Sequence, residues 1–164
     1  MGAAFPLVIH MRAALILSVI LSLAAGQAIA QVKMRCLSDT ELQVEQLVRH
    51  GVFLREAGRR CDDVVAGTNK LWTDFDQRWA AKLKQQTDKR AKVFTRQFKG
   101  DALKVRTYFD GRLVTYHRNY PLSLSYCTNV KELLDEVAKR GWGGFTGQAK
   151  VVQNEVLLDY NSCK

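Results

Sequence analysis

The chain has 164 residues, of which 47% are hydrophobic and 25% charged, and its formal net charge is +9. This length suits one domain with a real hydrophobic core and excludes two ordinary domains beside an export signal. The scarcity of histidine, three in the chain, and the absence of closely spaced cysteine pairs disfavour a metal centre.

The first 30 residues predict a cleavable secretory signal. Arg12 precedes an uncharged apolar run over residues 13–25, and Ala28-Ile29-Ala30 places small residues at the positions that a signal peptidase reads. The apolar run is too short for a comfortable membrane span. We therefore expect an exported protein, periplasmic or extracellular, with a single helical domain over residues 31–164 and no transmembrane segment after cleavage.

The mature part is expected to be helical. Ser38-Asp39-Thr40-Glu41 is a capping box, which predicts the start of a helix that ends near residues 59–60. A second helix is expected to begin at Thr68 or Asn69. Apolar residues then recur at steps of three and four from Phe94 to Tyr120, which indicates helix with a break at residues 100–101. Two further helices are expected over residues 128–141 and 145–161.

One signal conflicts with this pattern. Asp110-Gly111 lies between strand-forming residues, which is typical of a hairpin turn, so a small β-hairpin near residues 104–118 is the alternative. The longer helical period favours helix there. The predicted fold class is all-α, a compact bundle of about five helices with two disulfides.

Four cysteines lie in the mature part, and an even number in an exported protein predicts two disulfides: Cys36, Cys61, Cys127 and Cys163. A continuous first helix would separate Cys36 from Cys61 by roughly 30 Å, too far for a bond. Pairing in sequence order, Cys36–Cys61 and Cys127–Cys163, therefore requires a break near Gly51; otherwise the pairing must be crossed. The antiparallel arrangement expected of the last two helices favours sequence order.

The positive charge is concentrated in residues 82–118, which hold 11 basic and 3 acidic residues, whereas the rest of the mature part holds 13 of each. This segment is the candidate anion-binding surface, with five named residues: Lys89, Lys92, Arg96, Lys99 and Arg106. The predicted partner is an anionic envelope component or an acidic protein. Nucleic acid is disfavoured because the nearby aromatic residues fall on the apolar helix face. The alternative is an ordinary solvated helix face.

A second cluster precedes Pro121 and forms a possible pocket for a carboxylate or phosphate: Tyr108, Arg112, Tyr116, His117 and Tyr120. His117 would be its titrating group. The alternative is a helix edge at which tyrosines bury their rings and keep their hydroxyl groups in water.

The function predicted from these features is a non-catalytic binding module that uses residues 82–118. The alternatives are a small enzyme with a site near Arg112, Tyr116 and His117, and a periplasmic chaperone or inhibitor that acts on a protein. Hydrolase and c-type haem motifs are absent, and no catalytic residue, metal or cofactor is predicted.

Overall fold

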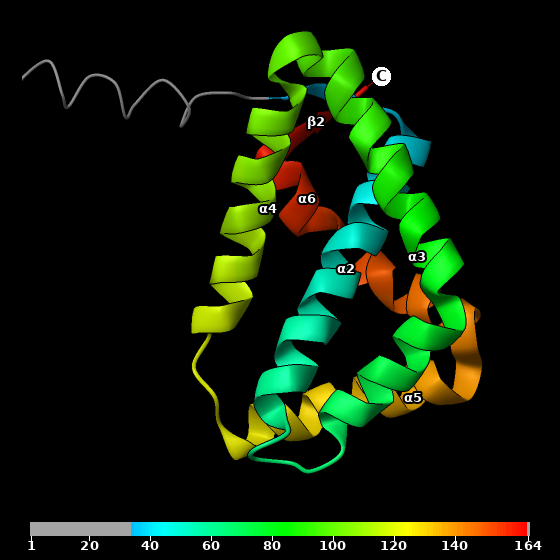
Figure 1. Ribbon diagram of the computed structural model, residues 1–164, viewed down its shortest axis with the longest axis vertical. Helices are drawn as coiled ribbons and strands as arrows, with labels where there is room; N and C mark the ends of the chain where they lie inside the picture. Colours follow the sequence, from blue (N-terminus) through cyan, green and yellow to red (C-terminus); the bar gives the residue numbers. More distant parts are fainter. Residues whose placement is uncertain (1–33, 164) are drawn as a thin grey trace, which may run out of the picture. The chain divides into compact units, whose positions relative to one another are not determined.

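The computed structural model of the protein describes residues 34–163 (Figure 1). In chain order its elements are β1 (Met34–Leu37), α2 (Asp39–Cys61), α3 (Thr68–Phe98), α4 (Ala102–Asn119), α5 (Leu124–Ala149), α6 (Gln153–Asp159) and β2 (Tyr160–Ser162). Helix α2 contacts α3, α4, α5 and α6. The predicted signal peptide lies outside the described residues.

Helix α2 begins where the sequence predicts. The Ser38 hydroxyl accepts a hydrogen bond from the Glu41 backbone N–H at 3.4 Å, and the Glu41 carboxylate accepts one from the Ser38 N–H at 2.9 Å. This capping box satisfies two N–H groups that the first turn leaves without a partner. The helix then runs unbroken for 23 residues and places Arg59 and Arg60 in its last turn.

Two disulfides are present, as predicted, but the favoured pairing is wrong. Cys36 bonds to Cys163, and Cys61 bonds to Cys127. Since α2 is continuous through Gly51, Cys36 and Cys61 lie at opposite ends of it and cannot meet. The resulting bridges are nested rather than sequential or crossed. The outer bridge joins the two ends of the described chain, beside the parallel pairing of β1 with β2.

The helical class is confirmed, but the observed division of the chain into helices differs from the predicted one. Three long helices dominate: α2, α3 with 31 residues and α5 with 26. At Gly141, where a helix end was expected, the backbone leaves the helical conformation with a φ of 59°, so α5 consists of two helical segments joined at a kink. The hairpin alternative near residues 104–118 is also wrong, because α4 is helical there. The β1–β2 pair was not predicted.

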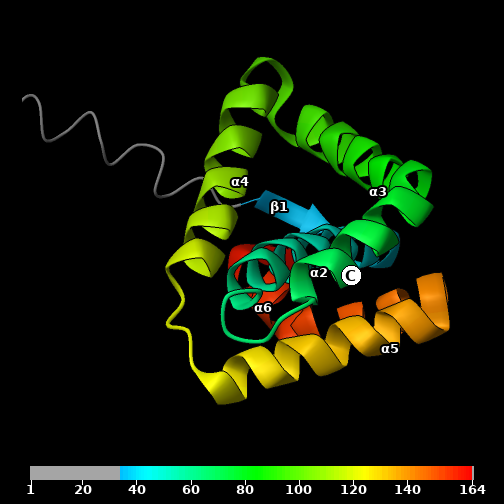
Figure 2. The same ribbon diagram turned by 60° about the horizontal axis from the view of Figure 1, so that its bottom comes forward.

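The main hydrophobic core lies between α2, α3 and α5 (Figure 2). Its members are Leu47, Leu54, Ala57, Trp72, Phe75, Val130, Leu134, Val137, Phe145 and Ala149, together with the Cys61–Cys127 bridge. Gly58 allows α2 to lie close to α3 and α5, because a Cβ atom at this position would be only 3.3 Å from both Leu134 Cδ1 and the Thr68 carbonyl oxygen. The periodic apolar residues of the three long helices therefore form the core at this end of the protein.

A second group of buried rings lies toward the other end of α2. Phe94 of α3, Phe109 of α4 and Tyr160 of β2 follow one another with ring centroids 5.9 Å and 5.7 Å apart. These rings attach α4 and the C-terminal strand to α3. Among residues 34–163, no helix has the length and apolar character needed to cross a membrane.

Candidate functional site

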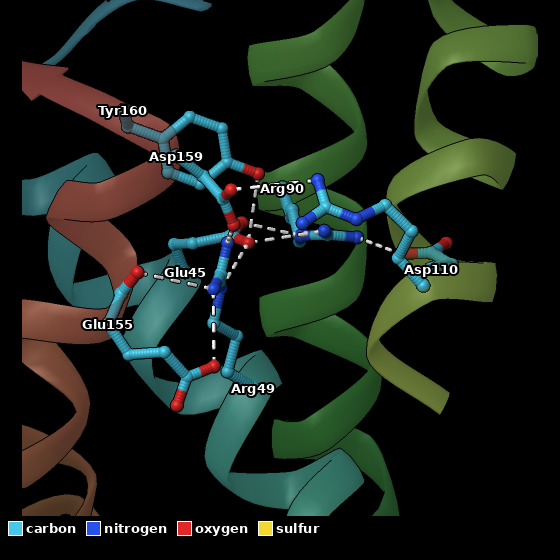
Figure 3. A network of polar contacts seen from close by, with 8 residues as sticks. Glu45, Arg49, Arg90, Asp110, Glu155, Asp159 and Tyr160 are labelled. Atoms are coloured by element: carbon cyan, nitrogen blue, oxygen red, sulfur yellow. Dashed lines mark hydrogen bonds and ion pairs between the residues drawn. The ribbon is translucent and has the colours of Figure 1, made fainter. Parts of the chain in front are cut away.

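A buried carboxylate, Glu45 of α2, is the centre of a polar cluster (Figure 3). Only 3% of Glu45 is exposed. Its Oε1 accepts hydrogen bonds from Arg49 Nε at 3.1 Å, Arg90 Nη2 at 3.2 Å and the Tyr160 hydroxyl at 3.1 Å. Its Oε2 accepts one from Arg90 Nε at 2.5 Å. The carboxylate is thus bound by donors from α2, α3 and β2.

The two arginines extend the cluster outward. Arg49 Nη2 donates to Asp159 Oδ2 at 2.6 Å, and Arg49 Nη1 lies 3.2 Å from Glu155 Oε1. Arg90 forms an ion pair with Asp110 of α4. Consequently one continuous network of ion pairs and hydrogen bonds connects α2, α3, α4, α6 and β2.

Burial and mutual attraction act in opposite directions on these groups. Burial by itself raises the pKa of Glu45, but the positive charges and hydrogen bonds of Arg90 and Arg49 outweigh it and hold that pKa below its usual value. Burial and the neighbouring Glu45 carboxylate raise the pKa of the Tyr160 phenol. Near neutral pH, therefore, Glu45 is ionised and Tyr160 remains a hydrogen-bond donor to it.

A cavity of about 850 Å³ lies against this cluster, between α4 and α6. Its charged lining residues are Glu45, Arg49, Arg90, Arg112, Glu155 and Asp159, and its apolar and aromatic ones are Tyr108, Phe109, Leu113, Tyr116 and Leu158. Arg112 Nη1 lies 3.7 Å from Asp159 Oδ1 and its guanidinium carbon 5.8 Å from the Tyr108 ring centroid. The cavity thus has a charged inner wall and mixed apolar and charged sides.

The structure brings together only part of the pocket predicted before Pro121. Tyr108, Arg112 and Tyr116 line the cavity, whereas His117 and Tyr120 do not. His117 is buried with its ring 5.4 Å from that of Phe53, and burial lowers its pKa. The Tyr120 ring lies 4.8 Å from that of Tyr126. The imidazole proposed as the titrating group is therefore part of the packing rather than of the cavity lining.

The basic segment is partly neutralised by acidic residues that are distant in sequence. Arg96 donates two hydrogen bonds to Glu41 of α2, at 2.8 Å and 2.9 Å. Arg118 donates to Glu56 of α2 at 2.8 Å. Arg112 pairs with Asp159, and Arg90 is buried in the cluster around Glu45. Sequence alone therefore overstates the free positive charge of residues 82–118.

Six cations of the segment have no ion-pair partner within the part of the chain that the structure describes: Lys82, Lys89, Lys92, Lys99, Lys104 and Arg106. Lys82 instead lies over the Trp79 ring, with its Nζ 4.7 Å from the centroid, and is set apart from the other five. These five lie on the second half of α3, on the short 3-10 turn Lys99–Asp101 and on the first turns of α4, and Leu103 lies between Lys99 and Lys104 in sequence. Leu103 is 67% exposed. We call these five cations and Leu103 the basic corner; it lies where α3 turns into α4 (Figure 1). Of the predicted anion-binding residues, only Arg96 has an ion-pair partner.

Sequence reasoning missed Glu45, Arg49 and Arg90 as site residues. A signal was present, because Glu45 and Arg49 are four apart and each directly follows a valine of the apolar stripe of the first helix, Val44 or Val48. A charged pair on the buried face of a helix must find partners, since unpaired buried charges are costly. That the partner is Arg90, 45 residues away, could not be read from spacing.

Within residues 34–163, no group of three or more His, Cys, Asp or Glu residues is placed to hold a metal ion. Comparisons of the chain with protein-family models, with curated proteins and with solved structures find no match.

Proposed function

We propose that this protein is an exported, non-catalytic binding module that attaches to an anionic membrane surface through the basic corner. The observation that carries the proposal is a set of five cations that have no ion-pair partner among residues 34–163 and that lie on both sides of the turn between α3 and α4, where Leu103 is exposed. Export is supported by the two disulfides, which persist in oxidising compartments, and by the signal-like sequence of the first 30 residues.

The composition of the corner favours a lipid surface over an acidic protein. Four of its five cations are lysines, whose flexible side chains carry point charges that suit a diffuse plane of phosphates better than a bidentate partner. Each lysine or arginine close to an anionic bilayer contributes about 1 kcal/mol of binding free energy. Leu103 adds an apolar side chain that can enter the headgroup region, where its burial is favourable.

The test is co-sedimentation of the mature protein with vesicles of phosphatidylglycerol and phosphatidylcholine, compared with vesicles of phosphatidylcholine alone. The test variant carries Lys89→Glu, Lys92→Glu and Lys99→Glu. The control carries Arg78→Glu, Lys139→Glu and Lys150→Glu, which changes the net charge equally at exposed positions outside the corner. We expect the test variant to bind anionic vesicles about 100-fold more weakly, since about 1.4 kcal/mol corresponds to a factor of ten.

Binding of the wild-type protein should also weaken steeply as salt is added, because the contacts are between exposed charges. Equal loss of binding in the two variants would show that net charge, and not the corner, is responsible. Failure of the wild-type protein to bind anionic vesicles at low salt would refute the proposal. If an acidic protein partner were captured instead through the same residues, the lipid assignment would be wrong.

A further inference from the structure

The geometry points to a second binding site, independent of the basic corner: we infer that the cavity between α4 and α6 takes a small zwitterionic ligand with an apolar body, of which a short peptide with free ends is the model. The inference rests on charges of both signs that line the cavity from α4 and α6, on the apolar side chains in the same lining and on the cavity volume.

Charges of opposite sign line the cavity from two different helices. Arg112 belongs to α4, and Glu155 and Asp159 belong to α6. The side chain of Arg112 is 56% exposed, and its ion pair with Asp159 is long, at 3.7 Å. Long ion pairs between exposed groups contribute little to stability. A ligand that carries a carboxylate and an ammonium group can therefore replace this contact with two shorter ones at small cost.

The charge balance of the lining argues against a ligand of one sign. The cavity is lined by three arginines and three carboxylates. A purely anionic ligand would be repelled by Glu155 and Asp159, and a purely cationic ligand would be repelled by Arg112. Arg49 and Arg90 cannot simply turn toward a ligand, because Glu45 binds both of them at the buried inner wall. Asp159 Oδ2 is likewise held by Arg49. The accessible charges are thus Arg112 on α4 and, on α6, Asp159 Oδ1 and the Glu155 carboxylate, whose side chain is 42% exposed although it also contacts Arg49.

The remaining walls are suited to the body of such a ligand. Leu113 and Tyr116 of α4 and Leu158 of α6 line the cavity, and Leu158 is 82% exposed in the free protein. A ligand with apolar side chains would cover this surface, which is favourable. The volume of about 850 Å³ is within the usual range for small-molecule sites, roughly 300–1,000 Å³. A single amino acid would leave most of it unfilled, whereas a short peptide would not.

The experiment is equilibrium dialysis of the mature protein against a mixture of tripeptides with random side chains and free ends, read by mass spectrometry of the retained peptides. Two matched mixtures remove one charge each, by acetylation of the amino end or amidation of the carboxyl end. We expect retention of free tripeptides to exceed that of both blocked mixtures about tenfold, because charged hydrogen bonds are lost in each.

Three variants locate the site. Arg112→Gln should reduce retention of free and acetylated peptides, and Glu155→Gln that of free and amidated ones, each about tenfold for the free mixture. Arg118→Gln is the control, because Arg118 is also an exposed α4 arginine in an ion pair but does not line the cavity. Circular dichroism verifies that each variant is folded.

Equal retention of free and blocked mixtures, or an equal effect of Arg112→Gln and Arg118→Gln, would overturn the inference, as would no retention by the wild-type protein. Vesicle binding by Arg112→Gln should remain, since Arg112 is outside the basic corner. The two proposals can therefore fail separately.

Discussion

Helix α2 contacts the rest of the domain in different ways at its two ends. Its C-terminal half packs against α3 and α5 through apolar side chains and the Cys61–Cys127 bridge. Its N-terminal half contacts α3, α6 and β2 through the ion cluster centred on Glu45. Apolar side chains fill the space at the first end, whereas the charged contacts at the second line an open cavity. The ligand-sized cavity lies at the end where direction-specific polar contacts replace close packing.

The largest effect should come from breaking the charged end. Glu45→Gln removes the negative charge that two buried guanidinium groups share, and we expect the free energy of unfolding to fall by about 3–5 kcal/mol. Urea denaturation measures the change. Asp74→Asn is the matched control, because it removes an exposed ion pair with Lys70 and should cost less than about 1 kcal/mol. Similar small losses in both variants would mean that the cluster adds little to stability.

The disulfides permit a direct comparison of the two ends. Replacing either pair of cysteines with alanine should lower the free energy of unfolding by about 2–5 kcal/mol. Loop-closure entropy favours the outer bridge by about 0.6 kcal/mol, because it closes 127 residues against 66. The double variant Cys61→Ala, Cys127→Ala could nevertheless lose more free energy of unfolding than the double variant Cys36→Ala, Cys163→Ala. The difference between the two losses would then measure the apolar packing around the inner bridge. An unchanged melting temperature in either double variant would contradict a structural role for that bridge.

A smaller effect is expected at the apolar end on acidification. His50 is buried beside Phe145, with Nε2 3.0 Å from Gln148 Oε1, and burial lowers its pKa to about 4 from the usual value of 6.5. The unfolded chain therefore binds this proton first, so stability falls as the pH drops below 6.5, by about 3 kcal/mol once the pH is near 4.

The matched variant for this prediction is His50→Gln, which can still form a hydrogen bond with Gln148 but does not titrate. His117 and several carboxylates also have lowered pKa values, so both proteins should lose stability in acid. The difference between their unfolding free energies, followed from pH 7 to pH 4.5, isolates His50. Parallel curves for the two proteins would show that His50 is not held neutral.

The sequence predicted the local features well and the contacts between distant segments poorly, for physical reasons. Helical periodicity and the capping box at Ser38 depend on residues three or four apart, which the sequence displays directly. The contact of Arg90 with Glu45 and the pairing of Cys36 with Cys163 depend on which helices become neighbours, and local spacing carries no record of that. The same applies to the basic segment, whose charge was counted correctly but whose neutralisation by Glu41 and Glu56 was not foreseen.

The nesting of the two bridges has a consequence for proteolysis. A single cut in the exposed connection between α4 and α5, around Pro121, would leave two fragments that remain joined through both Cys36–Cys163 and Cys61–Cys127. The same is true of a cut at Gly100, between α3 and α4. A molecule cut once by a protease would thus keep both fragments covalently joined until a reductant separates them. Because the fragments stay together, their non-covalent contacts can keep the cut molecule folded.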